Sequence, residues 1–331
     1  MTDGATPDKV MQLITGAWAA SILGAAARHG LFTALDGNPD TAEGLARKTG
    51  ISMRGAQALA DGLTGLGILA LSNGKYQNTP DASAFLVKGK PSYLGDMAEV
   101  FLEDFGTWQK LPEAAKTGLP TAPHTADVAD NPFWHVLVTA IAPLSFPVAQ
   151  MAAERLGLSA KGPIAWLDVG GGSGVWSAAW LGINKQATGY QLDWPHVNAI
   201  GREFVARFGV GDRFKTIDGD FHATDFGAAR YDFAIYSHIA HQETPADNIA
   251  TFRKFRKALK PGGTLVVNDF ILNDDRTGHP FAMMFASQML VVTKDGFTYR
   301  QADYRSWLSE AGFASVEIMT TPTPATVVLA R

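Results

Sequence analysis

Residues 164–174 have the sequence Ile164-Ala165-Trp166-Leu167-Asp168-Val169-Gly170-Gly171-Gly172-Ser173-Gly174. An apolar run of strand length ends there in an acid and a glycine cluster, and a helix-like segment, 175–181, follows it. A strand that leads into a glycine turn and then a helix is typical of the start of a nucleotide-binding α/β domain. The glycines allow a tight turn and a close approach of the ligand, and the helix N-terminus adds unpaired N–H groups. The stretch therefore predicts a ligand-binding loop at the end of a strand.

The spacing of these glycines excludes two common types of nucleotide-binding loop. They stand at 170, 172 and 174, with Asp168 two residues ahead of the first, whereas a dinucleotide-binding loop of the form G-x-G-x-x-G would need a glycine in place of Val175. No Walker-type lysine follows either. The alternative is a glycine-rich turn without a ligand.

Length and composition limit the architecture. The 331 residues are enough for two domains, and 46% hydrophobic with 18% charged residues is typical of a chain that forms a core. The sequence has no apolar run long enough for a transmembrane helix and no secretory signal at its start, so we expect no membrane partner and a cytoplasmic location. The absence of cysteine excludes disulfides and thiolate metal sites, and the net charge of −4 disfavours nucleic-acid binding.

The N-terminal part predicts a small helical module. An alanine-rich helix over 5–28 is apolar around most of its surface, Thr41 and Ser52 begin two further helices as N-caps, and a hairpin turns at Asn73-Gly74. Three helices and a hairpin make a winged helix. Between residues 36 and 70 the acids outnumber the bases by one, so we expect homodimerisation through 5–28 rather than DNA binding. A largely helical stretch, 91–157, with a loop break between Pro120 and Pro132, follows.

The second half alternates strands with helices. Strands are predicted at 188–192, 213–217, 231–236 and 263–269, and helices at 197–208, 246–259 and 301–311. Right-handed crossovers between such strands produce a mostly parallel sheet. Two further runs, 314–318 and 325–329, predict an antiparallel hairpin at the sheet edge.

Acids follow the second and third strands of this pattern. Asp193 could accept both ribose hydroxyls of an adenosine ligand, with Trp194 covering the adenine; alternatively, Asp193 is the N-cap of the next helix. Asp220 could accept from the adenine amino group while Phe221 stacks on the ring; alternatively, the pair lies in a solvated turn.

Two histidines follow the fourth strand, ahead of a helix that Thr244 should cap. His241 suits a general base, and His238 could touch the substrate; either could instead only pack in the loop. They could also ligate a metal, but no third ligand is evident, so we expect none. Asp269 ends the neighbouring strand at the same edge. Apolar side chains that could cover a substrate, or else fill the core, are Trp134, Phe146, Met284, Phe285 and Met289.

The whole chain resembles the small-molecule O-methyltransferases that carry a winged-helix dimerisation domain before a class I methyltransferase domain. Plant caffeate-type and bacterial natural-product enzymes belong to this family. The stretches that carry the resemblance are Leu167–Gly174, Gly219–Phe221, Lys260–Gly263, Ala311–Phe313 and Trp108–Leu111. The resemblance implies a Rossmann-like α/β sheet with an antiparallel C-terminal hairpin, a dimerisation domain with linker over 1–118 and a methyltransferase domain over 119–331.

The resemblance also implies roles. The methyl donor is S-adenosylmethionine, the product is S-adenosylhomocysteine, and the residues implied to bind it are Asp168, Gly170, Gly172, Asp193, Trp194, Asp220, Phe221 and Ser237. Counting back from Gly263 places the family's catalytic histidine at His241, with Asp269 and Asp303 as the two acids that orient it. In the family a His-Asp-Trp triplet begins at that histidine, but here Gln242-Glu243 follow it, and Ser237 stands where many relatives have a basic residue.

These observations together predict methyl transfer to a hydroxyl of a flat, apolar, aromatic or pigment-like molecule. The alternatives within the family are carbon methylation and reactions without methyl transfer, such as decarboxylation or hydroxylation. The alternative outside the enzymes is a winged-helix regulator.

Overall fold

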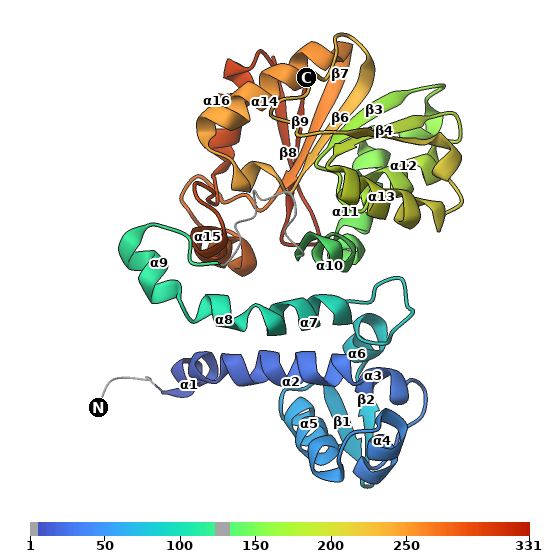
Figure 1. Ribbon diagram of the computed structural model, residues 1–331, viewed down its shortest axis with the longest axis vertical. Helices are drawn as coiled ribbons and strands as arrows, with labels where there is room; N and C mark the ends of the chain where they lie inside the picture. Colours follow the sequence, from blue (N-terminus) through green and yellow to red (C-terminus); the bar gives the residue numbers. More distant parts are fainter. Residues whose placement is uncertain (1–5, 123–132) are drawn as a thin grey trace. The chain divides into compact units, whose positions relative to one another are not determined.

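The computed structural model describes residues 6–122 and 133–331, and the chain forms two compact units, Met1–Gly106 and Thr107–Arg331 (Figure 1). The first unit contains α1 (Asp8–Ile14), α2 (Gly16–Arg28), α3 (Leu31–Ala34), α4 (Ala42–Thr49), α5 (Met53–Gly65), β1 (Leu69–Ser72), β2 (Lys75–Asn78), α6 (Pro80–Phe85) and α7 (Gly95–Glu103). Helix α8 (Phe105–Trp108) spans the boundary.

The first unit has the helices and the hairpin predicted for a winged helix. The hydroxyls of Thr41 and Ser52 accept from the backbone N–H groups of Gly44 and Gly55, which confirms both as N-caps. Asn73 and Gly74 have φ values of 50° and 72°, the left-handed pair that a two-residue hairpin turn requires.

The single helix predicted over 5–28 is wrong, because α1 and α2 meet at Thr15 at an angle of 50°. The Thr15 hydroxyl donates to the carbonyl of Met11, and Gly16 follows, a combination that weakens a continuous helix. The predicted apolar surface is present, since Leu13, Ile14 and Trp18 are 65–70% exposed. No single helix among the described residues is long and apolar enough to cross a membrane; α1 and α2 together meet that test by length and composition alone.

The second unit continues with α9 (Leu111–Thr117), α10 (Phe133–Ala140), α11 (Ala142–Arg155), β3 (Ala165–Val169), α12 (Val175–Ile183), β4 (Thr188–Asp193), α13 (Pro195–Ala206), β5 (Phe214–Asp218), β6 (Tyr231–Ser237), α14 (Pro245–Ala258), β7 (Leu259–Asp269), α15 (Pro280–Val292), α16 (Gln301–Glu310), β8 (Val316–Thr320) and β9 (Thr326–Ala330). Its strands form one sheet in the order β5-β4-β3-β6-β7-β9-β8, parallel from β5 to β7. Strand β9 runs antiparallel to both neighbours. This confirms the predicted α/β fold with its hairpin. Most of the predicted loop between Pro120 and Pro132 lies outside the described residues.

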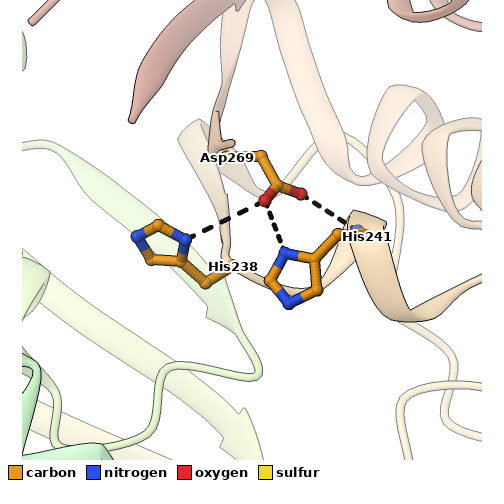
Figure 2. Close-up of side chains that lie close together, drawn as sticks. All are labelled: His238, His241 and Asp269. Carbon is orange, nitrogen blue, oxygen red and sulfur yellow. Dashed lines mark hydrogen bonds and ion pairs between the residues drawn. The ribbon is translucent and has the colours of Figure 1, made fainter. Parts of the chain in front are cut away.

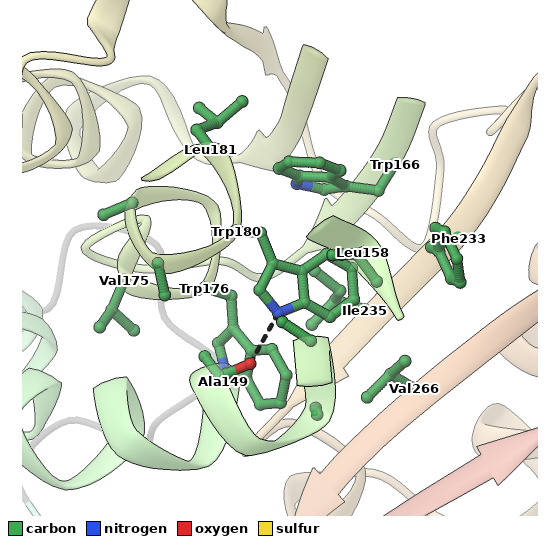
Figure 3. Close-up of a cluster of buried hydrophobic side chains, with 14 of the residues drawn as sticks. Ala149, Leu158, Trp166, Val175, Trp176, Trp180, Leu181, Phe233, Ile235 and Val266 are labelled. Carbon is green, nitrogen blue, oxygen red and sulfur yellow. Dashed lines mark hydrogen bonds between the residues drawn. The ribbon is translucent and has the colours of Figure 1, made fainter. Parts of the chain in front are cut away.

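Both faces of the sheet are buried, which explains why its central strands are apolar throughout. Three tryptophans, Trp166, Trp176 and Trp180, pack between one face and the helices α11 and α12, and the Trp180 indole donates to the carbonyl of Ala149 at 2.8 Å (Figure 3). Residues of α14 and α16 cover the other face. The carboxyl ends of β3 to β7 therefore meet along one edge, where polar side chains from five strands converge.

Candidate active site

The glycine loop after β3 requires its glycines. Gly170, Gly172 and Gly174 have φ values of 65°, 57° and 72°. A Cβ atom on Gly170 would lie 2.6 Å from the end of the Ile239 side chain, which would have to move to accommodate it. The loop borders a cavity of about 590 Å³ whose lining includes Gly170, Gly172, Asp193, Trp194, Asp220, Phe221 and Trp134. This volume is ordinary for a small-molecule site.

Asp193 is joined to this loop. Its Oδ2 accepts from the backbone N–H of Gly172 at 2.9 Å, and its Oδ1 accepts from that of Trp194 at 2.8 Å. Trp194, not Asp193, occupies the N-cap position of α13, so the N-cap alternative for Asp193 is wrong. Burial raises the pKa of Asp193 to about 6, although both backbone hydrogen bonds act to lower it.

Asp168 is fully buried behind the loop, and neither of its carboxylate oxygens has a hydrogen-bond partner among the described residues. Burial, and then the charge of Asp193, raise the pKa of Asp168 well above its usual range. A buried carboxyl without a partner is costly, and the raised pKa favours its neutral form. Asp168 does not itself line the cavity.

Asp220 and Phe221 line the same cavity, after β5. The Asp220 carboxylate contacts His222 Nδ1 at 2.9 Å, and His222 Nε2 lies 2.8 Å from Glu243 Oε2. Burial acts to raise the pKa of Asp220, but the hydrogen bonds from His222 outweigh it and lower the pKa. The ring of Phe221 stacks on that of His222 with centroids 4.1 Å apart. The bridge from Asp220 to Glu243 through His222 is not evident from the sequence.

His241 forms a pair with Asp269 (Figure 2). Its Nδ1 lies 2.5 Å from Asp269 Oδ1, and its backbone N–H donates to Oδ2 at 3.0 Å. A carboxylate only accepts, so Nδ1 carries the proton, and in the neutral ring the lone pair is therefore on Nε2, which points away from Asp269. The structure thus brings together two of the three residues predicted to be catalytic.

Asp269 is fully buried and accepts two further hydrogen bonds. The backbone N–H of Phe270 donates at 2.8 Å and the hydroxyl of Tyr304 at 3.0 Å. Burial acts to raise the pKa of Asp269, but the charge and hydrogen bond of His241 outweigh it and lower the pKa.

The structure does not bring Asp303 to this pair. Its carboxylate accepts from the backbone N–H and the guanidinium of Arg300, in a capping box at the start of α16. The expected role of Asp303 in orienting His241 is therefore not supported by any contact, because the aspartate side chain is engaged at its own helix terminus.

His238 lies beside the pair in a left-handed backbone conformation, with φ of 58°. Its Nε2 is 3.0 Å from Asn268 Nδ2, and its Nδ1 is 3.9 Å from Asp269 Oδ1. Burial lowers the pKa of His238 to about 4. Ser237, the preceding residue, accepts from the indole of Trp176 at 3.0 Å. Both Ser237 and His238 line a smaller cavity of about 70 Å³, whose lining includes Trp134 and Gly170 as well.

The metal-ligating atoms of His238, His241 and Asp269 all lie within 4.8 Å of one another, the only such group among residues 6–122 and 133–331. Asp269, which the sequence places at the same edge, completes this group of three. Each of its oxygens already accepts two hydrogen bonds, and His241 Nδ1 carries a proton toward one of them. The expectation that no metal binds stays a prediction.

The predicted substrate residues divide into two sets. Phe285 meets the His241 ring edge-on at 4.8 Å, and Trp134 lines both cavities. Phe285 and His241 themselves line neither cavity. The other three residues also line neither: Phe146 stacks on Phe208, Met284 is 61% exposed and Met289 is buried. Phe270, which sequence reasoning misses, and Phe281, which begins the predicted substrate-binding stretch 281–290, join Phe285 in an aromatic cluster next to His241. The sequence signal that could have identified Phe270 is its position directly after Asp269.

Comparison with known proteins agrees with this geometry. Residues 148–314 match the O-methyltransferase domain family, and residues 11–88 match the O-methyltransferase dimerisation domain. The chain is 31% identical to a 3-hydroxy-5-methyl-1-naphthoate 3-O-methyltransferase of Streptomyces sahachiroi, over 96% of this chain and 92% of the relative. It is 28% identical to the tetracenomycin polyketide synthesis 8-O-methyltransferase of Streptomyces glaucescens, over 98% and 96%.

A solved structure shares the fold. Human N-acetylserotonin methyltransferase, in complex with S-adenosylmethionine, superposes with a TM-score of 0.85 at 21% identity, over 100% of this chain and 99% of that one.

Proposed function

This chain belongs to the S-adenosylmethionine-dependent O-methyltransferases of the bacterial natural-product type, and we propose that it methylates a hydroxyl of a flat aromatic substrate with His241 as general base. The observation that carries the proposal is the His241–Asp269 pair, which fixes Nδ1 of the imidazole and, in the neutral ring, places the lone pair on Nε2, at the edge where the strands end. The two relatives from Streptomyces, a naphthoate and a tetracenomycin methyltransferase, support an aromatic substrate.

The residues present fit the cofactor. The glycine loop, the carboxyls of Asp193 and Asp220 and the ring of Phe221 line the larger cavity, and this set suits a ligand with positive charge, hydroxyl groups and an adenine base. We propose that Asp193 would accept from the ribose hydroxyls and Asp220 from the adenine amino group. When bound, the cofactor supplies an electrophilic methyl group, and the electrons of the carbon–sulfur bond return to sulfur as the substrate oxygen bonds to carbon.

The protein's own part is alignment and proton transfer. A phenol with pKa near 10 is a weak nucleophile at neutral pH, so a base within hydrogen-bond reach helps. His241 Nε2 would accept the hydroxyl proton, and the Asp269 carboxylate would stabilise the resulting imidazolium while it fixes the ring. Phe270, Phe281 and Phe285 would hold an aromatic substrate beside the base.

Methyl transfer from labelled cofactor to a panel of hydroxylated aromatic acids and polyketide-type phenols tests the proposal. We expect the label on oxygen, established by mass spectrometry and by NMR of the product. Label found on carbon, or cofactor binding without any transfer across the panel, would contradict O-methylation.

We further propose that the chain acts as a homodimer assembled through α1 and α2, and that residues 1–118 form the dimerisation part and 119–331 the methyltransferase part. The match to a dimerisation domain and the exposed Leu13, Ile14 and Trp18 support the homodimer.

A further inference from the structure

Tyr304 contacts the proposed catalytic pair from a helix distant in sequence. It lies on α16, is fully buried between the sheet and the helices α14 and α16, and its ring packs on Trp307 with centroids 5.3 Å apart. Its hydroxyl donates to Asp269 Oδ2 at 3.0 Å. A buried hydroxyl thus donates to the buried carboxylate that contacts the proposed base.

The four hydrogen bonds to Asp269 divide evenly between its oxygens. Oδ1 accepts from His241 Nδ1 and the Phe270 backbone, and Oδ2 accepts from the His241 backbone and Tyr304. Apart from His241 itself, Tyr304 is therefore the only side chain that donates to this carboxylate among the described residues. Without it, Oδ2 would keep a single donor in a fully buried position, where lost hydrogen bonds are most expensive.

The neighbouring acid does not perform this task. Asp303, one residue earlier on α16, is held by Arg300 through three hydrogen bonds at the helix start. A carboxylate near Asp269 would also repel it, whereas a hydroxyl can donate to it. The tyrosine at 304, unlike the aspartate at 303, is therefore able to donate a hydrogen bond to a buried carboxylate.

The tyrosine also stays a neutral donor. Burial, and then the charge of Asp269, hold the pKa of Tyr304 well above its usual range, so its oxygen keeps the proton. A cationic donor would cancel the charge of Asp269 and weaken its effect on His241, but a neutral hydroxyl orients the carboxylate and leaves the charge in place.

We propose that Tyr304 is a positioning residue, whose hydroxyl holds the Asp269 carboxylate with Oδ1 toward His241 and so sets the basicity and orientation of the proposed base. The inference rests on the proposed role of His241 in methyl transfer. Other titratable groups that interact with Asp269 are His238, Tyr236 and Tyr299, and none of these three donates a hydrogen bond to it.

The test compares Tyr304→Phe with Tyr299→Phe. Both variants lose one tyrosine hydroxyl from the same region and keep the ring, but the hydroxyl of Tyr299 donates to the backbone carbonyl of Glu243. In Tyr304→Phe the Asp269 carboxylate loses one of its four hydrogen-bond donors. Its negative charge then acts more strongly on His241 and favours the imidazolium form of that ring. We expect the acid limb of the kcat/KM profile to move upward by roughly 0.5–1 pH unit and kcat to fall about 3–10-fold, with cofactor affinity unchanged.

Proton NMR of the ligand-free protein gives a second measurement that does not depend on turnover. The downfield proton on His241 Nδ1 should shift in Tyr304→Phe and keep its position in Tyr299→Phe. The inference would be overturned if Tyr304→Phe had the same acid limb in its kcat/KM profile, and the same His241 Nδ1 proton resonance, as Tyr299→Phe. It would also be overturned if Asp303→Asn moved either one, because Asp303 would then be the orienting group.

The two proposals can fail separately. If the Nδ1 resonance shifts in Tyr304→Phe but His241→Ala keeps its turnover, Tyr304 positions the pair and His241 is not the base. If His241→Ala abolishes turnover while Tyr304→Phe behaves as the control does, the base stands and the positioning role falls. Thermal unfolding of each variant verifies that the fold is retained.

Discussion

A buried histidine is useful as a base only when one nitrogen is fixed and the other is available. Asp269 provides the first condition at Nδ1, and the proposed role requires the second at Nε2, which points away from Asp269 (Figure 2). General-base assistance contributes about 10²–10⁴-fold to a rate. His241→Ala should therefore lower turnover by about that factor, measured with saturating cofactor on the true substrate.

His238→Ala is the matched comparison for that variant. His238 is the neighbouring histidine but contacts Asp269 only at 3.9 Å, so we expect a change mainly in the KM of the acceptor. Calorimetry should give unaltered cofactor binding for both variants. Near-wild-type turnover of His241→Ala would mean that alignment alone drives the transfer or that carbon is methylated.

The pKa of Asp193 predicts how cofactor binding depends on pH. The ionised carboxylate accepts from hydroxyl groups more strongly than the protonated carboxyl does, and burial raises its pKa to about 6. Protonation therefore begins at a higher pH than for an exposed aspartate, and affinity should fall as the pH decreases through about 6. Calorimetric titrations with S-adenosylhomocysteine, from mildly alkaline to mildly acidic pH, measure this.

Asp193→Asn supplies the comparison for the pH dependence. At mildly alkaline pH it should bind the cofactor more weakly by about 1–3 kcal/mol, as expected for a lost charged hydrogen bond, and its affinity should change less on acidification. A variant profile as steep as that of the unmodified protein would assign the pH dependence to another group, such as Asp168.

At the scale of elements, two glycines distinguish the cost of backbone strain from the cost of a close contact. Gly170 has a positive φ, and a Cβ there would lie 2.6 Å from Ile239; Gly262 has φ of 77°, and a Cβ there would meet no atom within 4 Å. Gly262→Ala should thus cost only the strain, about 1–3 kcal/mol of the free energy of unfolding. Gly170→Ala should cost at least this strain and should also weaken cofactor binding, because Gly170 and the Ile239 side chain that must move both line the cavity.

Chemical denaturation and calorimetry of the two alanine variants measure these effects. The pair is informative because both substitutions introduce the same methyl group at a left-handed glycine. If Gly170→Ala binds the cofactor as tightly as Gly262→Ala does, the loop does not form the binding site.

Elements whose signals are local can be predicted from the sequence. The strand, glycine turn and helix at 164–181, the caps at Thr41, Ser52 and Thr244, and the Asn73-Gly74 hairpin depend on neighbouring residues, and the structure has each of them. The break at Thr15 escapes prediction because a threonine inside an apolar helical pattern does not by itself indicate a bend. The strand order makes the meeting of His241 and Asp269 foreseeable, since parallel neighbours end at the same edge.

The partners of that pair cannot be predicted in the same way. Tyr304 reaches Asp269 from α16, and the two residues are 35 positions apart in the sequence. A tyrosine in an amphipathic helix predicts only burial, and the direction of its hydroxyl depends on the packing of α14 and α16. Asp303, one position away, is the more obvious candidate for orienting His241 from sequence, because residue type can be read from the sequence and side-chain direction cannot.

At the scale of the whole molecule, the exposed apolar side chains of α1 and α2 predict assembly. Leu13, Ile14 and Trp18 are 69%, 65% and 70% exposed in the single chain, and apolar surface of this kind at one place marks an interface. Obligate homodimers bury more than about 2,000 Å² in total. We therefore expect light scattering to report a dimer at micromolar concentration.

Leu13→Glu combined with Trp18→Glu should convert this dimer to monomers, because burying two unpaired carboxylates opposes association by several kcal/mol. Leu71→Glu is the matched control: Leu71 is also an exposed apolar residue of the first unit, at 50%, but lies on the hairpin strand β1. It should remain dimeric with an unchanged unfolding transition. A single chain that is already monomeric at micromolar concentration, or a double variant that stays dimeric, would place the apolar surface of α1 and α2 outside the interface and leave its exposure to be explained by another partner.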